Sequence, residues 1–262
     1  MTTAALHVAR TGLDAQNMRM QVIANNLANV NTTGFKRDRA SFETLAYQTM
    51  TAAGAPSSDS TKFATGTNLG SGVAIRGTAK VDTQGSMQTT DNALDMAIEG
   101  GGYFQIQMPD GTTGYTRDGN FSLSSDGTLV TSEGYQLQPQ IQIPDGAEKI
   151  TISKDGTVSV NLTGQTEPSQ VGKIETARFT NPSGLESLGG NILKETASSG
   201  AAQVGAPNTE GRGAIRQGSL EASNVNIVEE LVDMIETQRA YEVNSKMIKS
   251  TDEMLQYVNQ NI

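Results

Sequence analysis

The chain has 262 residues, 28 of them glycine, with no cysteine, no tryptophan and an aromatic content of 5%. This composition allows a modest core and excludes disulfide bonds, thiolate catalysis and cysteine-based metal sites. The net charge of −9 argues against nucleic-acid binding and attachment to anionic lipid, because both need a basic surface. No apolar run is long enough to span a bilayer, and the N-terminus lacks the pattern of a cleavable signal peptide, so we expect neither.

Residues 3–31 are predicted to form a helix. Its apolar residues recur with the four-three spacing of a heptad seam, whose members are Leu6, Leu13, Met20, Ile23, Leu27 and Val30. The helix is expected to stop near residues 31–34, where Gly34 can adopt the left-handed conformation of a C-cap.

Polar residues near the end of this helix are predicted to make assembly contacts. Asparagine is a poor helix-interior residue, so Asn25, Asn26 and Asn29 are expected to meet other chains, with simple fraying as the alternative. Lys36 and Arg37 begin a small basic cluster. It is either a solvated charge run or a salt-bridge contact to an acidic neighbour.

The segment 35–72 is predicted to be a connecting arm. Residues 40–50 are expected to hold one or two helical turns, and residues 51–72 consist mainly of Ala, Gly, Ser, Thr and Asp. Such a stretch is either a flexible linker or an arm that becomes ordered against another subunit.

Residues 73–220 are predicted to form an antiparallel β domain. Short apolar alternations are separated by Asp-Gly steps at 110–111, 118–119, 126–127, 145–146 and 155–156. Asp-Gly between alternating strands is a strong hairpin signal, so each step is expected to be a hairpin turn. No strand is assigned within residues 181–214.

Residues 221–262 are predicted to form a second long helix. Its apolar seam repeats every seven residues and consists of Ile227, Met234, Tyr241, Ile248, Leu255 and Ile262. A two-stranded coiled coil needs a second apolar position in each heptad, and that position is polar here. This favours a bundle of several helices over a dimeric zipper. Residues 1–45 carry five basic and three acidic groups, whereas residues 223–262 carry three basic and seven acidic groups. The two ends should therefore pair, with Arg239 and Glu242 among the charged contacts.

The predicted fold class is α+β and multidomain. The two long terminal helices form a coiled-coil or bundle domain, and the antiparallel all-β domain is inserted between them. The predicted segments are an assembly helix at 1–34, the arm at 35–72, the β-rich outer domain at 73–220 and the second assembly helix at 221–262.

Candidate catalytic groups are few. His7 is the single histidine and has no nucleophile or metal partner at a suitable spacing, and the Gly-rich run 100–102 lacks a phosphate-loop pattern. Asp91 with Asp95, or Asp118 with Asp126, could form an acid/base pair, but turn and surface roles are favoured. We therefore expect no enzyme activity, no metal and no cofactor.

Four motifs resemble those of the bacterial flagellar rod and hook proteins. They are IANNLANVNTTGFK at 23–36, NALDMAIEGGGYF at 92–104, YTRDGNF at 115–121 and SNVNIVEELVDMIETQRAYEVNSK at 223–246. Together they include both ends of the chain and much of its middle.

The resemblance implies a structural subunit of the flagellar basal body. Such proteins leave the cell unfolded through the flagellar type III export apparatus and stack into a hollow helical tube, with the terminal helices inside and the β domain outside. The length and the segment 46–72 point to the distal rod, the periplasmic drive shaft that joins the proximal rod to the hook and turns inside the P and L rings. In the family, the stretch at 47–70 is associated with a straight, stiff rod.

The expected partners are therefore other copies of the chain, proximal rod and hook-side proteins, the ring proteins and the export apparatus. Two alternatives are a proximal rod or hook subunit of the same family, and a cell-wall-cleaving enzyme that would use Asp91, Asp95 or Asp118.

Overall fold

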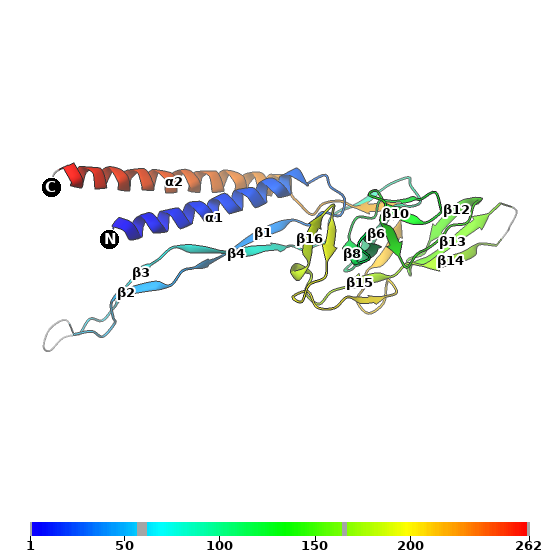
Figure 1. Cartoon of the computed structure of the whole chain (residues 1–262), viewed down its shortest axis with the longest axis horizontal. Helices are drawn as coiled ribbons and strands as arrows, with labels where there is room; N and C mark the ends of the chain where they lie inside the picture. The colour runs from blue at the N-terminus through cyan, green and yellow to red at the C-terminus, as the bar shows by residue number, and fades with distance from the viewer. Residues whose placement is uncertain (1, 57–61, 164–166, 261–262) are drawn as a thin grey trace. The chain divides into compact units, whose positions relative to one another are not determined.

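The computed structural model describes residues 2–56, 62–163 and 167–260 (Figure 1). It has one long helix near each end and antiparallel strands between them, so the predicted α+β class is confirmed. The chain divides into two compact units. The helical unit contains Met1–Leu27, Asp38–Ala79 and Ile227–Ile262, and the β unit contains Ala28–Arg37 and Lys80–Asn226.

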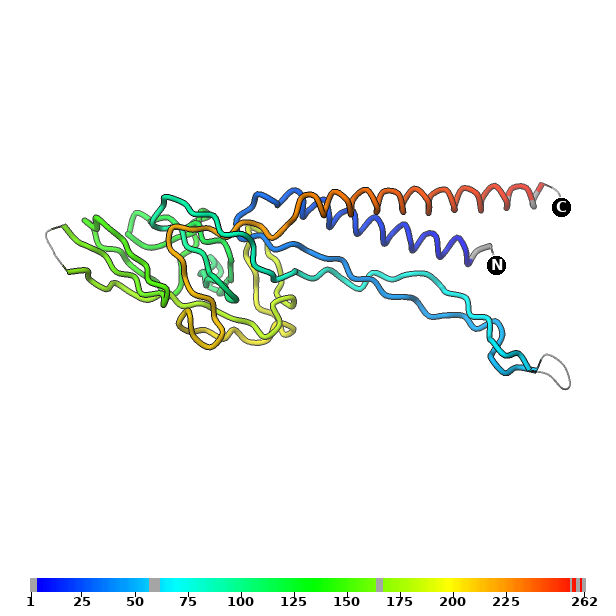
Figure 2. Tube along the Cα trace, turned by 180° about the vertical axis from the view of Figure 1, so that it is seen from behind, coloured from blue at the N-terminus to red at the C-terminus, as the bar shows by residue number. Residues whose placement is uncertain are grey.

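The helical unit contains α1 (Thr2–Ala28) and α2 (Ile227–Gln260), which lie side by side in both views (Figures 1 and 2). At about 1.5 Å per residue, α2 is ~50 Å long. Glu229 and Glu230 lie in its first turn, where negative charge stabilises a helix N-terminus.

Gly34 is not the C-cap of α1, because the helix ends at Ala28. The glycine has a φ of +69°, and a Cβ atom at this position would lie 2.7 Å from the backbone of Arg117. A close approach of two backbone segments within the β unit therefore requires glycine here.

The prediction of helical turns at residues 40–50 is wrong, because this part of the helical unit is extended. β1 (Asp38–Thr44) pairs with β4 (Val73–Lys80), and β2 (Tyr47–Thr51) pairs antiparallel with β3 (Thr67–Gly70). Figure 1 shows the two pairs as successive parts of one long ribbon. An isolated helix this short would be marginal, whereas Thr and aromatic residues favour a strand.

The β unit contains a nine-stranded sheet. Its main path runs in the order β16 (Glu186–Gly189), β17 (Ile192–Lys194), β8 (Thr113–Thr116), β7 (Tyr103–Gln107), β11 (Gln136–Gln138), β10 (Leu129–Thr131) and β9 (Phe121–Leu123). β15 (Thr176–Arg178) pairs with β7 and with β18 (Gln203–Gly205). Strands β16 to β18 and the short 3₁₀ helix η1 (Pro182–Gly184) lie in the stretch for which the sequence predicts no strand.

Smaller sheets complete the β unit. One has three strands, β12 (Ala147–Ile152), β13 (Thr157–Leu162) and β14 (Ser169–Lys173). The other two are pairs, β19 (Ala214–Gln217) with β6 (Met96–Glu99), and β20 (Ser219–Glu221) with β5 (Met87–Thr89). Thus the stretch just before α2 returns to pair with strands from the start of the β unit.

Two apolar cores hold the β unit together. The larger contains Phe104 and Phe121, whose rings meet edge to face with centroids 5.2 Å apart. The smaller contains Tyr115 and Phe179, also edge to face, at 4.7 Å. Each of these aromatic side chains buries a large apolar area, and the rest of the larger core is aliphatic.

Three of the five predicted Asp-Gly hairpins are confirmed. The steps at 110–111, 126–127 and 155–156 join β7 to β8, β9 to β10 and β12 to β13. The steps at 118–119 and 145–146 are not hairpin turns, because the strands on either side of each do not pair with one another. At Gly119 a Cβ atom would lie 1.5 Å from the carbonyl oxygen of Met96, so close backbone packing explains that glycine.

Neither α1 nor α2, over its described residues, contains a stretch that is long and apolar enough to cross a membrane.

Candidate assembly surface and its supporting networks

The two helices meet through small and polar residues that recur every seven positions. This layer consists of Gly12, Arg19 and Asn26 on α1 and of Glu230, Thr237, Asn244 and Thr251 on α2. Gly12 faces Asn244 and Asn26 faces Glu230, so the helices are antiparallel and keep one register. Since a Cβ atom on Gly12 would lie 3.1 Å from Nδ2 of Asn244, glycine permits the close approach.

Hydrogen bonds allow this polar layer to be buried. Thr237, only 1% exposed, donates its hydroxyl to the carbonyl oxygen of Asp233 one turn earlier, at 2.6 Å. Asp233 also forms a half-exposed salt bridge with Arg19, at 3.3 Å. Thr237 and Arg19 therefore both have polar partners within the helical unit, and the salt bridge itself adds ~1 kcal/mol or less.

Asn26 joins three elements of the helical unit. Its amide nitrogen donates to the carbonyl oxygen of Asp38 at 2.9 Å and to both carboxylate oxygens of Glu230 at 3.3 Å. Its amide oxygen accepts the backbone N–H of Asp38 at 2.9 Å. Because Asn26 is 1% exposed, its carboxamide holds the start of β1 and the first turn of α2 against α1 inside one chain.

We expect Asn26→Asp to weaken this junction by roughly 2 kcal/mol or more. The new carboxylate cannot donate to Asp38 and would carry the same charge as Glu230, and both effects are strongest in a buried site. Hydrogen exchange of the amide of Asp38 measures the junction directly. Asn17→Asp, on an exposed position of α1, is the control and should leave that rate unchanged; equal exchange in both variants would contradict the assignment.

The β1–β4 ribbon is attached to α1 through Thr11 and Gly72. The hydroxyl of Thr11 accepts the backbone N–H of Val73 at 3.3 Å and donates to the carbonyl oxygen of Val8 at 2.9 Å. Gly72 has a φ of +113°, and a Cβ atom there would lie 2.3 Å from Oγ1 of Thr11. Thus glycine is required both by its backbone conformation and by the contact with α1.

Gly72→Ala is expected to loosen this attachment by roughly 1–3 kcal/mol, because it combines backbone strain with a steric clash. Faster hydrogen exchange at the amide of Val73 would report the change. Gly54→Ala is the matched control, since Gly54 also has a positive φ, of +80°, but a Cβ atom added there would have no neighbour within 4 Å. If both variants exchange alike at Val73, the contact with Thr11 does not matter.

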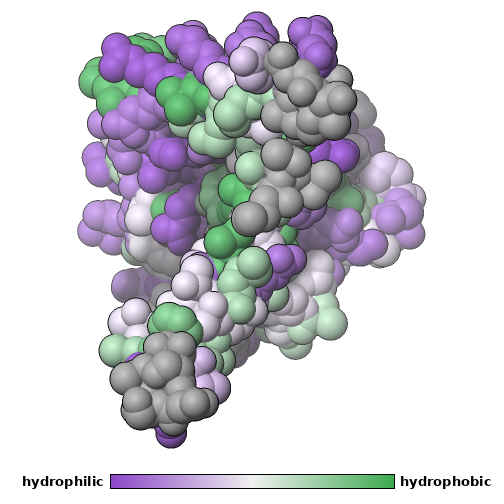
Figure 3. Space-filling view, turned by 90° about the vertical axis from the view of Figure 1, so that its left-hand side faces the viewer, coloured by the Kyte–Doolittle hydropathy of each residue, from purple (hydrophilic) through white to green (hydrophobic). Residues whose placement is uncertain are grey.

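One side of α2 exposes large apolar side chains. We call it the apolar face, and it consists of Leu231, Val232, Ile235, Val243 and Met254, which are between 42% and 62% exposed. Their spacing places them on one side of a helix. Figure 3 shows that hydrophobic patches interrupt the hydrophilic surface at the end of the molecule that faces the viewer. Exposed apolar residues clustered on one element mark an interaction surface.

The structure places the predicted seam residues at different depths. Ile23 is buried, Leu6, Leu13, Met20, Leu27, Val30, Met234 and Ile248 are half-buried, and Ile227 and Tyr241 are exposed. The side chain of Leu255 and the whole of Ile262 lie outside the described residues.

The residues predicted to make polar assembly contacts also differ in burial. Asn26 and Lys36 are buried, Asn29 and Arg37 are half-buried, and Asn25, Arg239 and Glu242 are exposed. Arg239 and Glu242 follow Ile235 by four and seven positions, which places them on the same side of α2 as the apolar face. Asn26 and Lys36, by contrast, make their polar contacts within the chain.

Lys36 belongs to a buried charge cluster in the β unit, which we define as Lys36, Arg117 and Glu221. The ammonium group of Lys36 lies 2.7 Å from Oε1 of Glu221, and Nε of Arg117 lies 2.6 Å from Oε2. The backbone N–H of Gly85 also donates to Glu221, at 2.8 Å. All three charged side chains are 5% exposed or less.

The remaining donors of the cluster are also used. Lys36 donates to the carbonyl oxygen of Thr83 at 2.7 Å, and the guanidinium of Arg117 donates to the carbonyl oxygens of Gly102, Gly100 and Ile98. Full hydrogen bonding is what makes a buried ion pair tolerable. The cluster therefore ties segment 28–37 to β20 and to the loop between β6 and β7.

Burial and charge shift the titration of these groups. Burial, together with the positive charge of Arg117, lowers the pKa of Lys36 although Glu221 opposes the shift. Burial alone would raise the pKa of Glu221, but Arg117 and Lys36 outweigh it, so its pKa lies below the usual range. Burial and the nearby Asp82 raise the pKa of the Tyr103 hydroxyl, which donates to Asp82 at 2.9 Å.

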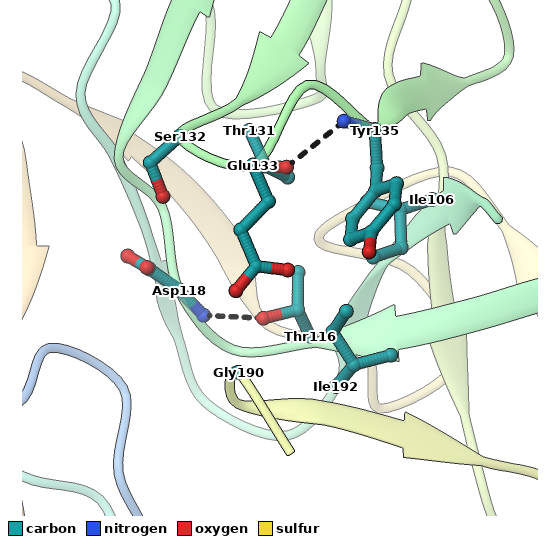
Figure 4. Close-up of a pocket in the computed structure, with 9 residues that line it drawn as sticks. All are labelled: Ile106, Thr116, Asp118, Thr131, Ser132, Glu133, Tyr135, Gly190 and Ile192. Atoms are coloured by element: carbon teal, nitrogen blue, oxygen red, sulfur yellow. Dashed lines mark hydrogen bonds between the residues drawn. The ribbon is translucent and has the colours of Figure 1, made fainter. Parts of the chain in front are cut away.

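The carboxylates considered for catalysis have structural contacts. Asp95 is buried and accepts hydrogen bonds from Thr90 at 2.7 Å and Asn92 at 2.9 Å, and Asp91 is exposed. Asp118 lines a small pocket with Glu133 and Thr116 (Figure 4). The pocket volume is about 20 Å³, which is room for a water molecule and far below that of a sugar-binding cleft.

No group of three or more potential metal ligands occurs among the residues that the structure describes. His7 is exposed on α1, where it lines an open groove together with Met50 and Leu69.

Sequence reasoning missed the residues that carry most of the polar contacts. Glu230, Thr237, Asn244 and Thr251 are seven residues apart, so their spacing is visible in the sequence, but an apolar seam is the usual sign of a helix interface. Arg117 lies inside a motif quoted for the resemblance, yet nothing in a linear sequence pairs it with Glu221. That pairing depends on the return of β20 to β5.

Comparison with known proteins gives the class of this chain. Three family models match, namely "Flagella basal body rod protein" at residues 6–36, "Flagellar hook protein FlgE/F/G D1 domain" at 97–160 and "Flagellar basal body rod FlgEFG protein C-terminal" at 216–261. The chain is 51% identical to the flagellar basal-body rod protein FlgG of Buchnera aphidicola subsp. Schizaphis graminum, over 98% of both chains.

Two relatives from one organism show that the chain is more similar to FlgG than to FlgF. The chain is 49% identical to FlgG of Caulobacter vibrioides, over 98% of both chains. It is 35% identical to FlgF of that organism, over 95% of this chain and 94% of the relative.

The chain therefore belongs to the family of flagellar basal-body rod proteins. It assembles with other rod and hook proteins of the flagellum and with copies of itself. Within that family it is a structural subunit of the distal rod.

Proposed function

We propose that the chain polymerises head to tail into a hollow helical drive shaft that transmits torque from the motor to the hook. The observation that carries the proposal is the apolar face of α2, five large side chains that remain 42% to 62% exposed in the single chain. Burying each would contribute roughly 1.5–3 kcal/mol at most. A contact between two different faces of a subunit does not close on itself, so it generates a helical filament.

In this proposal the terminal helices form a multi-helix bundle with those of neighbouring subunits. The polar layer between α1 and α2 sets their register, while the apolar face meets the next subunit. The predicted seam residues, together with Asn25, Asn29, Arg37, Arg239 and Glu242, supply further contacts between subunits. Torque then passes through many repeated helix contacts, and no bond is made or broken.

The β domain, in this proposal, is an insertion that faces outward toward the P and L rings. The ribbon made by β1 to β4, within the predicted arm at 35–72, contributes to a straight, stiff shaft. The rod lies in the periplasm, and its subunits reach it unfolded through the flagellar type III export apparatus. Support comes from the family to which the chain belongs.

Electron microscopy with helical reconstruction of the assembled polymer tests the proposal. We expect straight tubes with α2 of one subunit packed on helices of its neighbours. A curved tube would favour the hook alternative, and a polymer in which the apolar face stays exposed would overturn the interface. The proximal rod alternative is tested by the position of labelled subunits along the rod.

A cell-wall-cleaving activity is the distant alternative. It predicts turnover of peptidoglycan by the purified chain and loss of that turnover in variants of Asp91, Asp95 or Asp118. We expect no turnover.

A further inference from the structure

The β unit is joined to the helical unit at four points along the chain, between residues 27 and 28, 37 and 38, 79 and 80, and 226 and 227. Residues just inside the β unit at three of these points contact one another. They are Arg37, Val81 with Thr83, and Asn224. The chain therefore brings these three connecting segments together within the β unit itself.

Asn224 makes these contacts with a single carboxamide. Its side-chain oxygen accepts the backbone N–H of Arg37 at 2.7 Å. Its side-chain nitrogen donates to the carbonyl oxygen of Val81 at 2.8 Å, and to the carbonyl and hydroxyl oxygens of Thr83 at 3.0 Å. The backbone N–H of Val81 also donates to the carbonyl oxygen of Arg37 at 2.9 Å. Both ends of the amide are thus used, each on a different segment.

The buried charge cluster lies next to Asn224 in the sequence and uses the same segments. Glu221 precedes Asn224 by three residues, and its partner Lys36 precedes Arg37 by one. The backbone N–H of Gly34 donates to the carbonyl oxygen of Glu221 at 2.8 Å, and that of Ala222 donates to Ser86 at 2.8 Å. The segment that begins at residue 28, after the remaining connection, is held by Asn191, whose amide donates to the carbonyl oxygen of Thr33 at 2.8 Å.

We propose that Asn224 is a positioning residue that clamps the three connecting segments so that load enters the β unit through all of them together. The reason is mechanical. β5 and β20 have three residues each, so a strand pulled alone would be held by few hydrogen bonds and would peel away from its neighbour. This inference rests on the proposed torque-transmitting role, but the clamp itself can be tested without it.

The test compares Asn224→Asp, Asn224→Ser and Asn120→Asp. Aspartate retains the acceptor for Arg37 but loses the donations to Val81 and Thr83 and places negative charge against their two carbonyl oxygens. Serine is too short to reach all three segments and adds no charge, so it covers the case in which the aspartate variant does not fold. Asn120 is exposed in the same unit, so its variant controls for the added charge.

Hydrogen exchange of the purified full-length chain is the first measurement. The amide of Arg37 should exchange about tenfold faster in the serine variant, which removes its acceptor, and less so in the aspartate variant, which keeps that acceptor. The amide of Val81, which donates to Arg37, should exchange faster in both variants, because each loses the donations that hold the segment of Val81 and Thr83. The amides of β13 in the core should keep their rates, as should all amides of Asn120→Asp. Unchanged exchange at Arg37 and Val81 would show that there is no clamp.

Rotation of a bead attached to the hook is the second measurement, made at low and at high load in cells that carry each variant. Rods should assemble with Asn224→Ser, turn normally at low load and slip or stall at high load. Faster exchange combined with normal rotation at high load would show that the clamp exists but does not carry torque. A failure of the Asn120→Asp control to turn would instead point to a general effect of charge and overturn the assignment to Asn224.

Discussion

Replacing Glu221 with glutamine is expected to lower the free energy of unfolding of the β unit by ~3–5 kcal/mol. The substitution leaves two positive side chains, Lys36 and Arg117, buried at 5% exposure or less without their shared counter-charge. Removing one partner of a buried ion pair has effects of this size, because the remaining charge is neither solvated nor paired. Urea unfolding followed by the near-ultraviolet circular dichroism of the tyrosines measures the change.

Two variants make this prediction specific. Glu186→Gln removes a carboxylate from an exposed position on β16 and should change the stability by less than ~0.5 kcal/mol. Lys36→Met should have an intermediate effect, since Glu221 remains paired with Arg117. A loss below ~1 kcal/mol in Glu221→Gln would mean that the cluster is not a main source of stability.

The same cluster predicts that the β unit loses stability in acid. The folded state holds the pKa of Glu221 below its ordinary value of 4.5, so the unfolded chain binds the proton first as the pH falls. The stabilisation from Glu221 is therefore complete above pH 4.5 and is lost as the pH drops through the folded pKa. The fall in stability below that pH should be shallower in Glu221→Gln than in the wild-type chain.

Ile235→Asp is expected to abolish rod assembly while the single chain keeps its stability. Ile235 is 50% exposed at the centre of the apolar face, so an aspartate there costs little in the monomer. In the polymer the same carboxylate would be buried against apolar neighbours without a partner, which is strongly unfavourable. Thermal unfolding of the purified chain and electron microscopy of basal bodies measure the two effects separately.

Asp252→Asn, also on α2, is the control for this prediction. Asp252 is exposed and lies on the side of the helix opposite Val232, Val243 and Met254, so this variant should assemble and swim normally. Ile248→Asp and Leu27→Asp, in the predicted seams, should also block assembly, but with some loss of monomer stability because both residues are half-buried. Normal swimming with Ile235→Asp would show that the apolar face is not an interface.

The periodic parts of the chain could be predicted from sequence. Both helices follow from seven-residue spacing, and three hairpins follow from Asp-Gly between alternating residues, because these signals depend on neighbours only a few positions away. The strands at residues 38–51 could not be found in this way. Their stability depends on pairing with β3 and β4, whose partner residues are about 20 to 40 positions further along the chain.

The sequence by itself determined that this chain has two heptad-patterned helices around a β-rich middle, and that its ends carry opposite charge. Local spacing is enough for that, since the period of a helix or strand is a property of the backbone. Only the tertiary structure decided which face of α2 meets α1, and which charges are buried together. Glu221 and Lys36 are 185 positions apart, and only the return of β20 to β5 brings them within 2.7 Å.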